Sequence, residues 1–238
     1  AYKELAESPP PDLFIILGTV HLPTINPFIL TKKDFATPLG VVETASDIID
    51  AIAGKVPFDP FQDEILHKAE HTIEFQAVFL SYLFGDAARF RILPVLCGSF
   101  HDVTTGGCAA DHKPHLAGFI AALREAVEQS GCASCYIASA DLAHVGRRFG
   151  AAAAPSPADL HDVELQDRAM LSWAERIDAE GFFDFVRRER DRRNICGLPP
   201  IYALLRAIDA REGKLLDYRQ SVEPDGGSAV TFASMVFR

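Results

Sequence analysis

Three short apolar runs limit the folds open to this chain more than any other feature of the sequence. Each run has the length and composition of a buried strand. The runs are LFIILG (13–18), RILPVLCG (91–98) and CYIASA (135–140). Segments with helical character accompany them at 44–53, 62–84 and 114–129. Strands that alternate with helices are typical of a mostly parallel sheet covered by helices on both faces, so the sequence predicts a three-layer α/β/α sandwich.

The C-terminal part of the chain predicts further helices and then a pair of strands. We expect the helices at 159–180, 182–192 and 199–210. The strands 215–221 and 229–237 flank the turn sequence EPDGG, and we expect them to add an antiparallel edge to the main sheet. The proline-containing stretch 21–37 is expected to be a long loop. Because no repeat or linker interrupts the pattern, residues 1–238 are interpreted as one domain.

Composition excludes several classes of protein. The 238 residues are 48% hydrophobic, as in globular proteins, and 33 acidic against 23 basic side chains leave a net charge of −10. This charge argues against nucleic acid as a partner, since phosphate binding needs a clustered positive surface. No apolar run reaches the roughly 18–20 residues of a membrane span, so no membrane partner is expected. Five cysteines, an odd number, and no visible signal peptide favour a cytoplasmic protein with free thiols.

Polar side chains follow several of the predicted strands. Ligands of open α/β sheets bind outside the carboxyl ends of the strands. His21 comes three residues after the first apolar run, and Asp141 and His144 follow the third in SADLAHVG. Ser221 and Glu223 follow the strand predicted at 215–221. We therefore expect these side chains to meet at one edge of the sheet.

A second group of ionisable residues lies in the predicted helix 62–84, within HKAEHTIEFQ. On a helix, His67 and His71 are i,i+4 neighbours on one face, a spacing that can bind one metal ion. The string also matches the H-x-x-E-H pattern of inverzincin proteases, which raises a zinc hydrolase as an alternative. For His67 by itself we expect a solvated helix residue. His71 lies beside an apolar run that should pack on the sheet, and Glu74 is a further pocket candidate.

Taken in series, the segments of the chain resemble the Memo family, also called AmmeMemoRadiSam system protein B. The matching segments occur in the family's order and span almost the whole chain: LGTVHLP, TPLGVVE, EHTIEFQAVFL, RILPVLCGS, SADLAHVG, NICGLPPI, DYRQS and SAVTFASMV. The family resembles the class III extradiol dioxygenases in fold, which implies a metal pocket at one sheet edge. Family members usually carry a PHAGY-like segment ahead of the AYKEL with which this sequence begins, so we expect that segment to be missing.

The resemblance also implies a set of site residues. The dioxygenases hold Fe(II) with two His and one carboxylate, and Memo proteins are reported to hold copper or iron with two His and one Cys. Carried over, the metal ligands are His21 and His71, and Asp141 and His144 line the same pocket. The position of the family's Cys ligand is occupied here by Pro224, which has no ligating side chain. Its neighbours Glu223 and Asp225 are carboxylates. We expect Glu223, which is nearer the strand end, to be the third ligand.

These observations support three hypotheses about function. In the first, His21, His71 and Glu223 hold Fe(II) or copper, with zinc as a further option. Asp141 orients His144 as the acid/base for redox chemistry on a small molecule, and Ser221 and Cys196 are pocket candidates. In the second, the same fold is a non-catalytic protein that binds an organic ligand or a peptide. In the third, a zinc hydrolase uses His67 and His71. The sequence specifies neither the ligand nor the oligomeric state.

Overall fold

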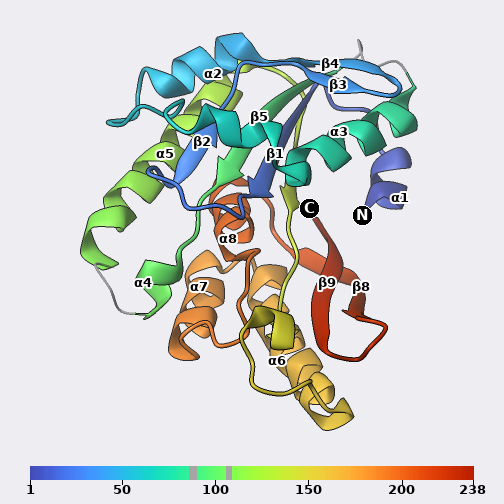
Figure 1. Cartoon of the computed structure of the whole chain (residues 1–238). Coiled ribbons are helices and arrows are strands. Elements are labelled where there is room, and N and C mark those ends of the chain that lie inside the picture. Colours follow the sequence, from blue (N-terminus) through green and yellow to red (C-terminus); the bar gives the residue numbers. More distant parts are fainter. Residues whose placement is uncertain (86–89, 106–108) are drawn as a thin grey trace.

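The fold is described from a computed structural model that covers residues 1–85, 90–105 and 109–238 (Figure 1). The strands are β1 (Leu13–Thr19), β2 (Phe28–Leu30), β3 (Phe35–Thr37), β4 (Gly40–Thr44), β5 (Arg91–Cys97), β6 (Ser134–Ser139), β7 (His144–Gly146), β8 (Gly213–Val222) and β9 (Ser228–Phe237). The α-helices are α1 (Tyr2–Ala6), α2 (Ser46–Ala53), α3 (His71–Phe84), α4 (His101–Thr105), α5 (Ala109–Ser130), α6 (Pro157–Glu175), α7 (Ala179–Arg188) and α8 (Leu198–Ala207). Short 3-10 helices span Glu64–Lys68 and Arg147–Phe149.

The main sheet has the strand order β3-β4-β5-β1-β6, and β2 also pairs with β5. The strands β4, β5, β1 and β6 run parallel to one another, whereas β2 and β3 pair antiparallel with their neighbours. The three apolar runs of the sequence therefore form β1 and the two strands beside it, and helices lie on both sides of them (Figure 1). The predicted α/β/α sandwich is confirmed.

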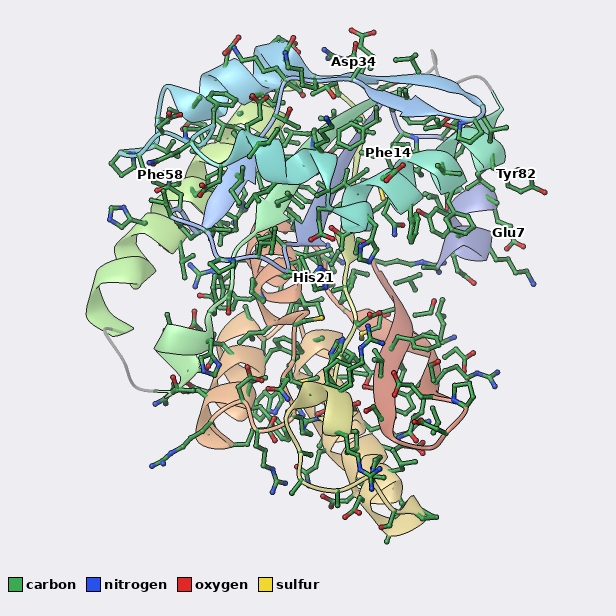
Figure 2. The ribbon with its side chains drawn as sticks, viewed as in Figure 1. Glu7, Phe14, His21, Asp34, Phe58 and Tyr82 are labelled. Atoms are coloured by element: carbon green, nitrogen blue, oxygen red, sulfur yellow. The ribbon has the colours of Figure 1, made fainter. Side chains whose placement is uncertain are left out.

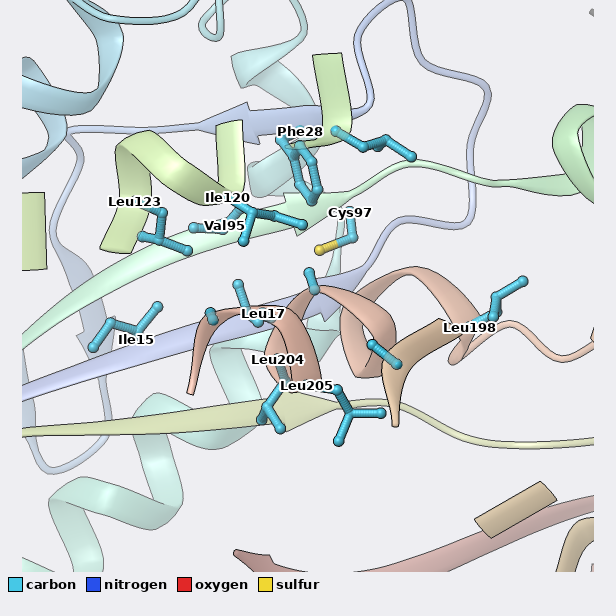
Figure 3. Close-up of a cluster of buried hydrophobic side chains, with 14 of the residues drawn as sticks. Ile15, Leu17, Phe28, Val95, Cys97, Ile120, Leu123, Leu198, Leu204 and Leu205 are labelled. Carbon is cyan, nitrogen blue, oxygen red and sulfur yellow. The ribbon is translucent and has the colours of Figure 1, made fainter. Parts of the chain in front are cut away.

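The central strand β1 is buried on both faces, which explains why its sequence lacks polar alternation. Its odd-numbered side chains, such as Ile15 and Leu17, pack with α2, α5 and α8 in the larger apolar cluster, part of which Figure 3 shows. Its even-numbered side chains, Phe14 and Ile16, pack on the other face with residues of α3. Since successive side chains of a strand point to opposite faces, one continuous apolar run serves both layers.

The C-terminal strands form a second sheet, which corrects the expectation that they extend the main one. β8 and β9 do pair antiparallel (Figure 1). β9 also pairs with β7, so that the order is β7-β9-β8. The three-residue strand β7 carries no apolar run that could have indicated this partner. The helix α6 packs against β8, and α7 packs against α6 and α8. The larger apolar cluster continues into this part through Met170, Phe182 and Tyr218.

Several other predicted boundaries were wrong. The helix expected at 62–84 is interrupted: the 3-10 helix ends at Lys68, and α3 begins at His71 after an extended Glu70. The helix expected at 159–180 ends at Glu175, and Asp178 caps the next one by accepting a hydrogen bond from the Gly181 amide at 2.8 Å. The stretch 21–37 contains β2 and β3 rather than loop alone. Within the described residues, no helix combines the length and apolarity needed to cross a bilayer.

Candidate functional site

The end of β1 and the start of α3 meet at the carboxyl edge of the main sheet. The Thr72 hydroxyl donates a hydrogen bond to the Thr19 carbonyl oxygen at 2.9 Å. This approach depends on Gly18, because a Cβ there would lie 2.5 Å from Thr72 Oγ1. The contact brings His21, just beyond β1, beside His71, the first residue of α3. Figure 2 labels His21 near the middle of the molecule, below the strands of the main sheet.

A single buried carboxylate holds both histidines. Glu70 is 8% exposed and is the N-cap of α3. Its Oε2 lies 3.0 Å from the His21 amide nitrogen and 2.9 Å from His21 Nδ1. Its Oε1 lies 3.0 Å from both the amide nitrogen and Nδ1 of His71. The two imidazole rings are stacked, with centroids 5.4 Å apart and planes at 10°.

This arrangement sets the tautomer of the His21 ring. Three hydrogen bonds reach Glu70, from the amide and Nδ1 of His21 and from the His71 amide. His71 Nδ1 lies close to Oε1, but this contact lacks the geometry of a hydrogen bond. When the His21 ring is neutral, its proton is therefore on Nδ1 and the Nε2 lone pair is free. Burial alone would raise the pKa of Glu70, but the hydrogen bonds and charge of His21 and the His71 amide outweigh it and lower that pKa. One ligating atom each of His21, Glu70 and His71 lies within 4.8 Å of the other two, so the three residues could hold a metal ion.

A cavity of about 1400 Å³ adjoins the pair, and both histidines line it. Asp141, which follows β6, also lines the cavity, as the edge rule predicts. The Asp141 side chain is exposed, and none of the described residues donates a hydrogen bond to its carboxylate. Cys196 lines the cavity too; its thiol lies 3.8 Å from the Asp141 carbonyl oxygen. Burial raises the pKa of Cys196 to about 12, so its thiol is protonated at neutral pH.

Other predicted site residues lie elsewhere. His144 is in β7 with Nδ1 3.1 Å from the Leu142 carbonyl oxygen, rather than bonded to Asp141, and it does not line the cavity. Glu223 accepts a hydrogen bond from Arg148 at 3.2 Å, and neither it nor Ser221 lines the cavity. Ser221 lies within β8 and Glu223 follows it, and because β8 is an antiparallel strand of the second sheet, the edge rule for parallel strands does not apply to them. Glu74 is exposed on α3, also outside the cavity.

His67 is not the solvated residue that we expected. Its Nε2 lies 3.1 Å from the Ile29 carbonyl oxygen, and its buried Nδ1 has no hydrogen-bond partner among the described residues. Because the chain is extended at Glu70, His67 and His71 are not neighbours on one helix. The i,i+4 geometry behind the zinc hydrolase alternative is therefore absent. Burial lowers the pKa of His67 to about 4, against the opposing effects of Ile29, Glu64 and Glu70.

His67 should make stability depend on pH. Its pKa is about 6.5 in the unfolded chain and about 4 in the folded one, so the unfolded state binds more protons between these values. Stability is thus fully present above pH 6.5 and falls by up to about 3 kcal/mol as the pH drops towards 4. Urea unfolding of metal-free protein at several pH values measures this loss. His67→Gln keeps a donor for Ile29 but does not titrate, and an equally steep pH dependence in this variant would rule out His67 as the cause.

Sequence reasoning missed the role of Glu70, which it noted only as a neighbour of the histidines. Glutamate is not among the preferred N-cap residues, so no capping rule selects it. The only signal was its position directly before His71. Among the cysteines, Cys97, Cys132, Cys135 and Cys196 have free thiols. Cys108 lies outside the described residues.

The comparisons with known proteins agree with the resemblance in sequence. The family model described as "Memo-like protein" matches residues 1–236. A MEMO1 family protein of Methanopyrus kandleri is 31% identical over 245 residues, covering 100% of this chain and 76% of that protein. A MEMO1 family protein of Aquifex aeolicus is 29% identical over 231 residues, covering 95% of this chain. The chain spans 56% of the length of that relative, and 80% of a 29% identical MEMO1 family protein of Pyrococcus abyssi.

The fold and the site define an α/β/α protein with a paired-histidine cluster at the carboxyl edge of its parallel sheet. The match over nearly the whole chain then shows its family. The chain belongs to the Memo-like protein family.

Proposed function

We propose that this protein binds a redox-active metal ion, iron or copper, at His21 and His71 and acts on a small molecule in the adjoining cavity. The observation that carries the proposal is the Glu70 carboxylate, which is hydrogen-bonded to His21 Nδ1 at 2.9 Å and lies 3.0 Å from His71 Nδ1, while neither Nε2 has a hydrogen-bond partner among the described residues. Metal-binding histidines commonly donate their second ring N–H to a carboxylate in this way. Imidazole nitrogens suit iron, copper and zinc.

The residues of the cluster take distinct parts in this proposal. His21 and His71 supply the ligands, and Glu70 orients them through its contacts with the two rings and with both amides. A bound iron or copper ion would supply one-electron and oxygen chemistry. Asp141 lines the same cavity with a free carboxylate and is the group we assign to accept a proton from the substrate. His144 and Glu223 have no part in this assignment, since both lie outside the cavity lining.

Metal content tests the proposal directly. Parent protein, purified without oxygen and reconstituted with Fe(II) or Cu, is expected to hold close to one equivalent by elemental analysis. His21→Ala and His71→Ala should each lose it. The matched control is His161→Ala, which removes an exposed histidine on α6 and should retain the metal. Metal-free parent protein, or unchanged loading in the two variants, would overturn the site. Zinc bound with neither iron nor copper would overturn the redox assignment alone.

The cavity favours a second candidate function, in which the protein binds an organic ligand or peptide without catalysis. Its volume of about 1400 Å³ is larger than the cavities of about 300–1000 Å³ that hold drug-sized ligands. Ligand binding that raises the melting temperature equally in the parent and in His21→Ala would support this function. Ligand binding that requires the histidine pair and a metal would exclude it.

A further inference from the structure

A buried ion pair lies behind the segment that carries Asp141. Asp167 of α6 is 0% exposed, and Arg193 is 3% exposed. Arg193 Nη1 donates to Asp167 Oδ1, while Nε and Nη2 of the same guanidinium donate to Glu189, Nη2 at 2.7 Å. Replacing a buried ion pair by apolar residues is often neutral or stabilising, so stability alone gives no reason for this one.

The aspartate end of the pair is connected to residues 142–143. Asp167 Oδ2 accepts hydrogen bonds from Tyr218 at 2.9 Å and from the Thr231 hydroxyl at 2.5 Å. The same Thr231 oxygen accepts from the Ala143 amide at 2.8 Å. Backbone bonds continue the attachment, because the Thr231 amide donates to the Ala143 carbonyl and the Leu142 amide donates to the Thr231 carbonyl.

The arginine end of the pair is connected to His144. The His144 amide donates to the Arg193 carbonyl oxygen at 2.7 Å. Asn194, which follows Arg193, donates from its side chain to the His144 carbonyl oxygen at 3.0 Å. Residues 142–144 are thus connected to Asp167 through Thr231 and bonded directly to the Arg193 backbone, and Asp141 immediately precedes them at the cavity.

We propose that the Asp167–Arg193 pair is a positioning device for the cavity: through Thr231 and the Arg193 backbone it holds residues 142–144 and so places Asp141. Asp167, Arg193 and Thr231 act through this segment and do not touch the substrate. The role of Asp141 in acting on a substrate rests on the proposed function. The hydrogen-bonded connection between the ion pair and residues 142–144 does not. The connection can therefore be tested on metal-free protein, separately from metal content.

Hydrogen–deuterium exchange of the metal-free protein gives the test. Thr231→Val keeps the shape but removes the hydroxyl that joins Ala143 to Asp167. Loss of a buried hydrogen bond should speed exchange in the peptide covering 141–146 by about tenfold. The peptide covering β1 should keep the parent rate. Thr231→Ser restores the hydroxyl and should restore the parent rate in 141–146.

Tyr218→Phe is the matched control, since it removes another hydroxyl from the same Asp167 oxygen, one that is not bonded to Ala143. It should leave exchange in 141–146 unchanged. Parent-like exchange in Thr231→Val, an equal increase in Tyr218→Phe, or no recovery in Thr231→Ser would each overturn the proposal. If Thr231→Val does not fold, Thr231→Ala removes the same hydroxyl without adding a methyl group against Asp167. Failure of metal binding in the parent would leave this result untouched and count only against the proposed function.

Discussion

Replacing Glu70 by alanine is expected to weaken metal binding by about 10–100-fold, the usual cost of losing an orienting partner behind ligating histidines. His21 Nδ1 would lose its hydrogen-bond acceptor and His71 Nδ1 its ion-pair contact, so the orientation of the two rings would no longer be set. The variant should also lose about 1 kcal/mol of stability, because the first turn of α3 loses its cap. Titration with Fe(II) or Cu, together with urea unfolding, measures the two effects.

Glu70→Gln distinguishes two effects of Glu70 on the imidazole rings, the orientation of a ring and the choice of its tautomer. The amide has nearly the shape of the carboxylate, but one end donates instead of accepting. That end can bond to an imidazole Nδ1 only if the proton of that ring moves to Nε2, where it blocks the metal. We therefore expect weak metal binding in this variant even though the side chain still fills the site. Nitrogen NMR of the imidazoles should show the His21 proton on Nδ1 in the parent. Parent-like affinity in Glu70→Gln would refute the assignment of this tautomer.

Gly18→Ala is expected to move His21 and His71 apart. Gly18 is the next even-numbered position of β1 after Phe14 and Ile16, so its added methyl group would point at α3. It would lie 2.5 Å from Thr72 Oγ1 and 3.0 Å from Ile73 Cγ1. Thr72 has little freedom to move, since it is 8% exposed and bonded to Thr19. We expect a loss of about 1–3 kcal/mol in stability, as for other overpacked interiors, and weaker metal binding.

The matched control for this variant is Gly118→Ala, in the middle of α5. Beyond its chain neighbours and the backbone of its own helix, no atom of the described residues lies within 4 Å of the Cβ that this change adds. Alanine in a helix interior is favoured over glycine by roughly 0.5–1 kcal/mol, so this variant should be slightly more stable and bind metal normally. If Gly18→Ala also binds metal like the parent, the contact between β1 and α3 does not set the histidine pair.

Much of the main sheet could be predicted because its central strands are simple in sequence. A strand buried on both faces is a continuous apolar run, and β1, β5 and β6 were found in this way. The second sheet could not be predicted, since β7 is only three residues long and pairs with a strand more than eighty residues away. Local sequence patterns do not indicate such a distant partner.

The site residues also divide into those that could be predicted from the sequence and those that could not. His21 and Asp141 follow parallel strands, so a rule about strand ends brings them to one edge without further information. Glu223 follows a strand too, but its position depended on which sheet that strand joins. The resemblance to a family indicated His71, and nothing in the sequence indicated that the acid next to it would hold both rings.

The sequence by itself determined that central strands and helices alternate along the chain, and the family, and it pointed to His21 and His71. Apolar composition and periodicity are local properties, and a chain can display them without its partners. Only the tertiary structure decided which carboxylate accompanies the histidines, because that choice depends on where α3 begins and on how closely β1 approaches it. The break at Glu70 and the missing side chain of Gly18 together bring one acid within hydrogen-bonding distance of two residues that lie fifty positions apart.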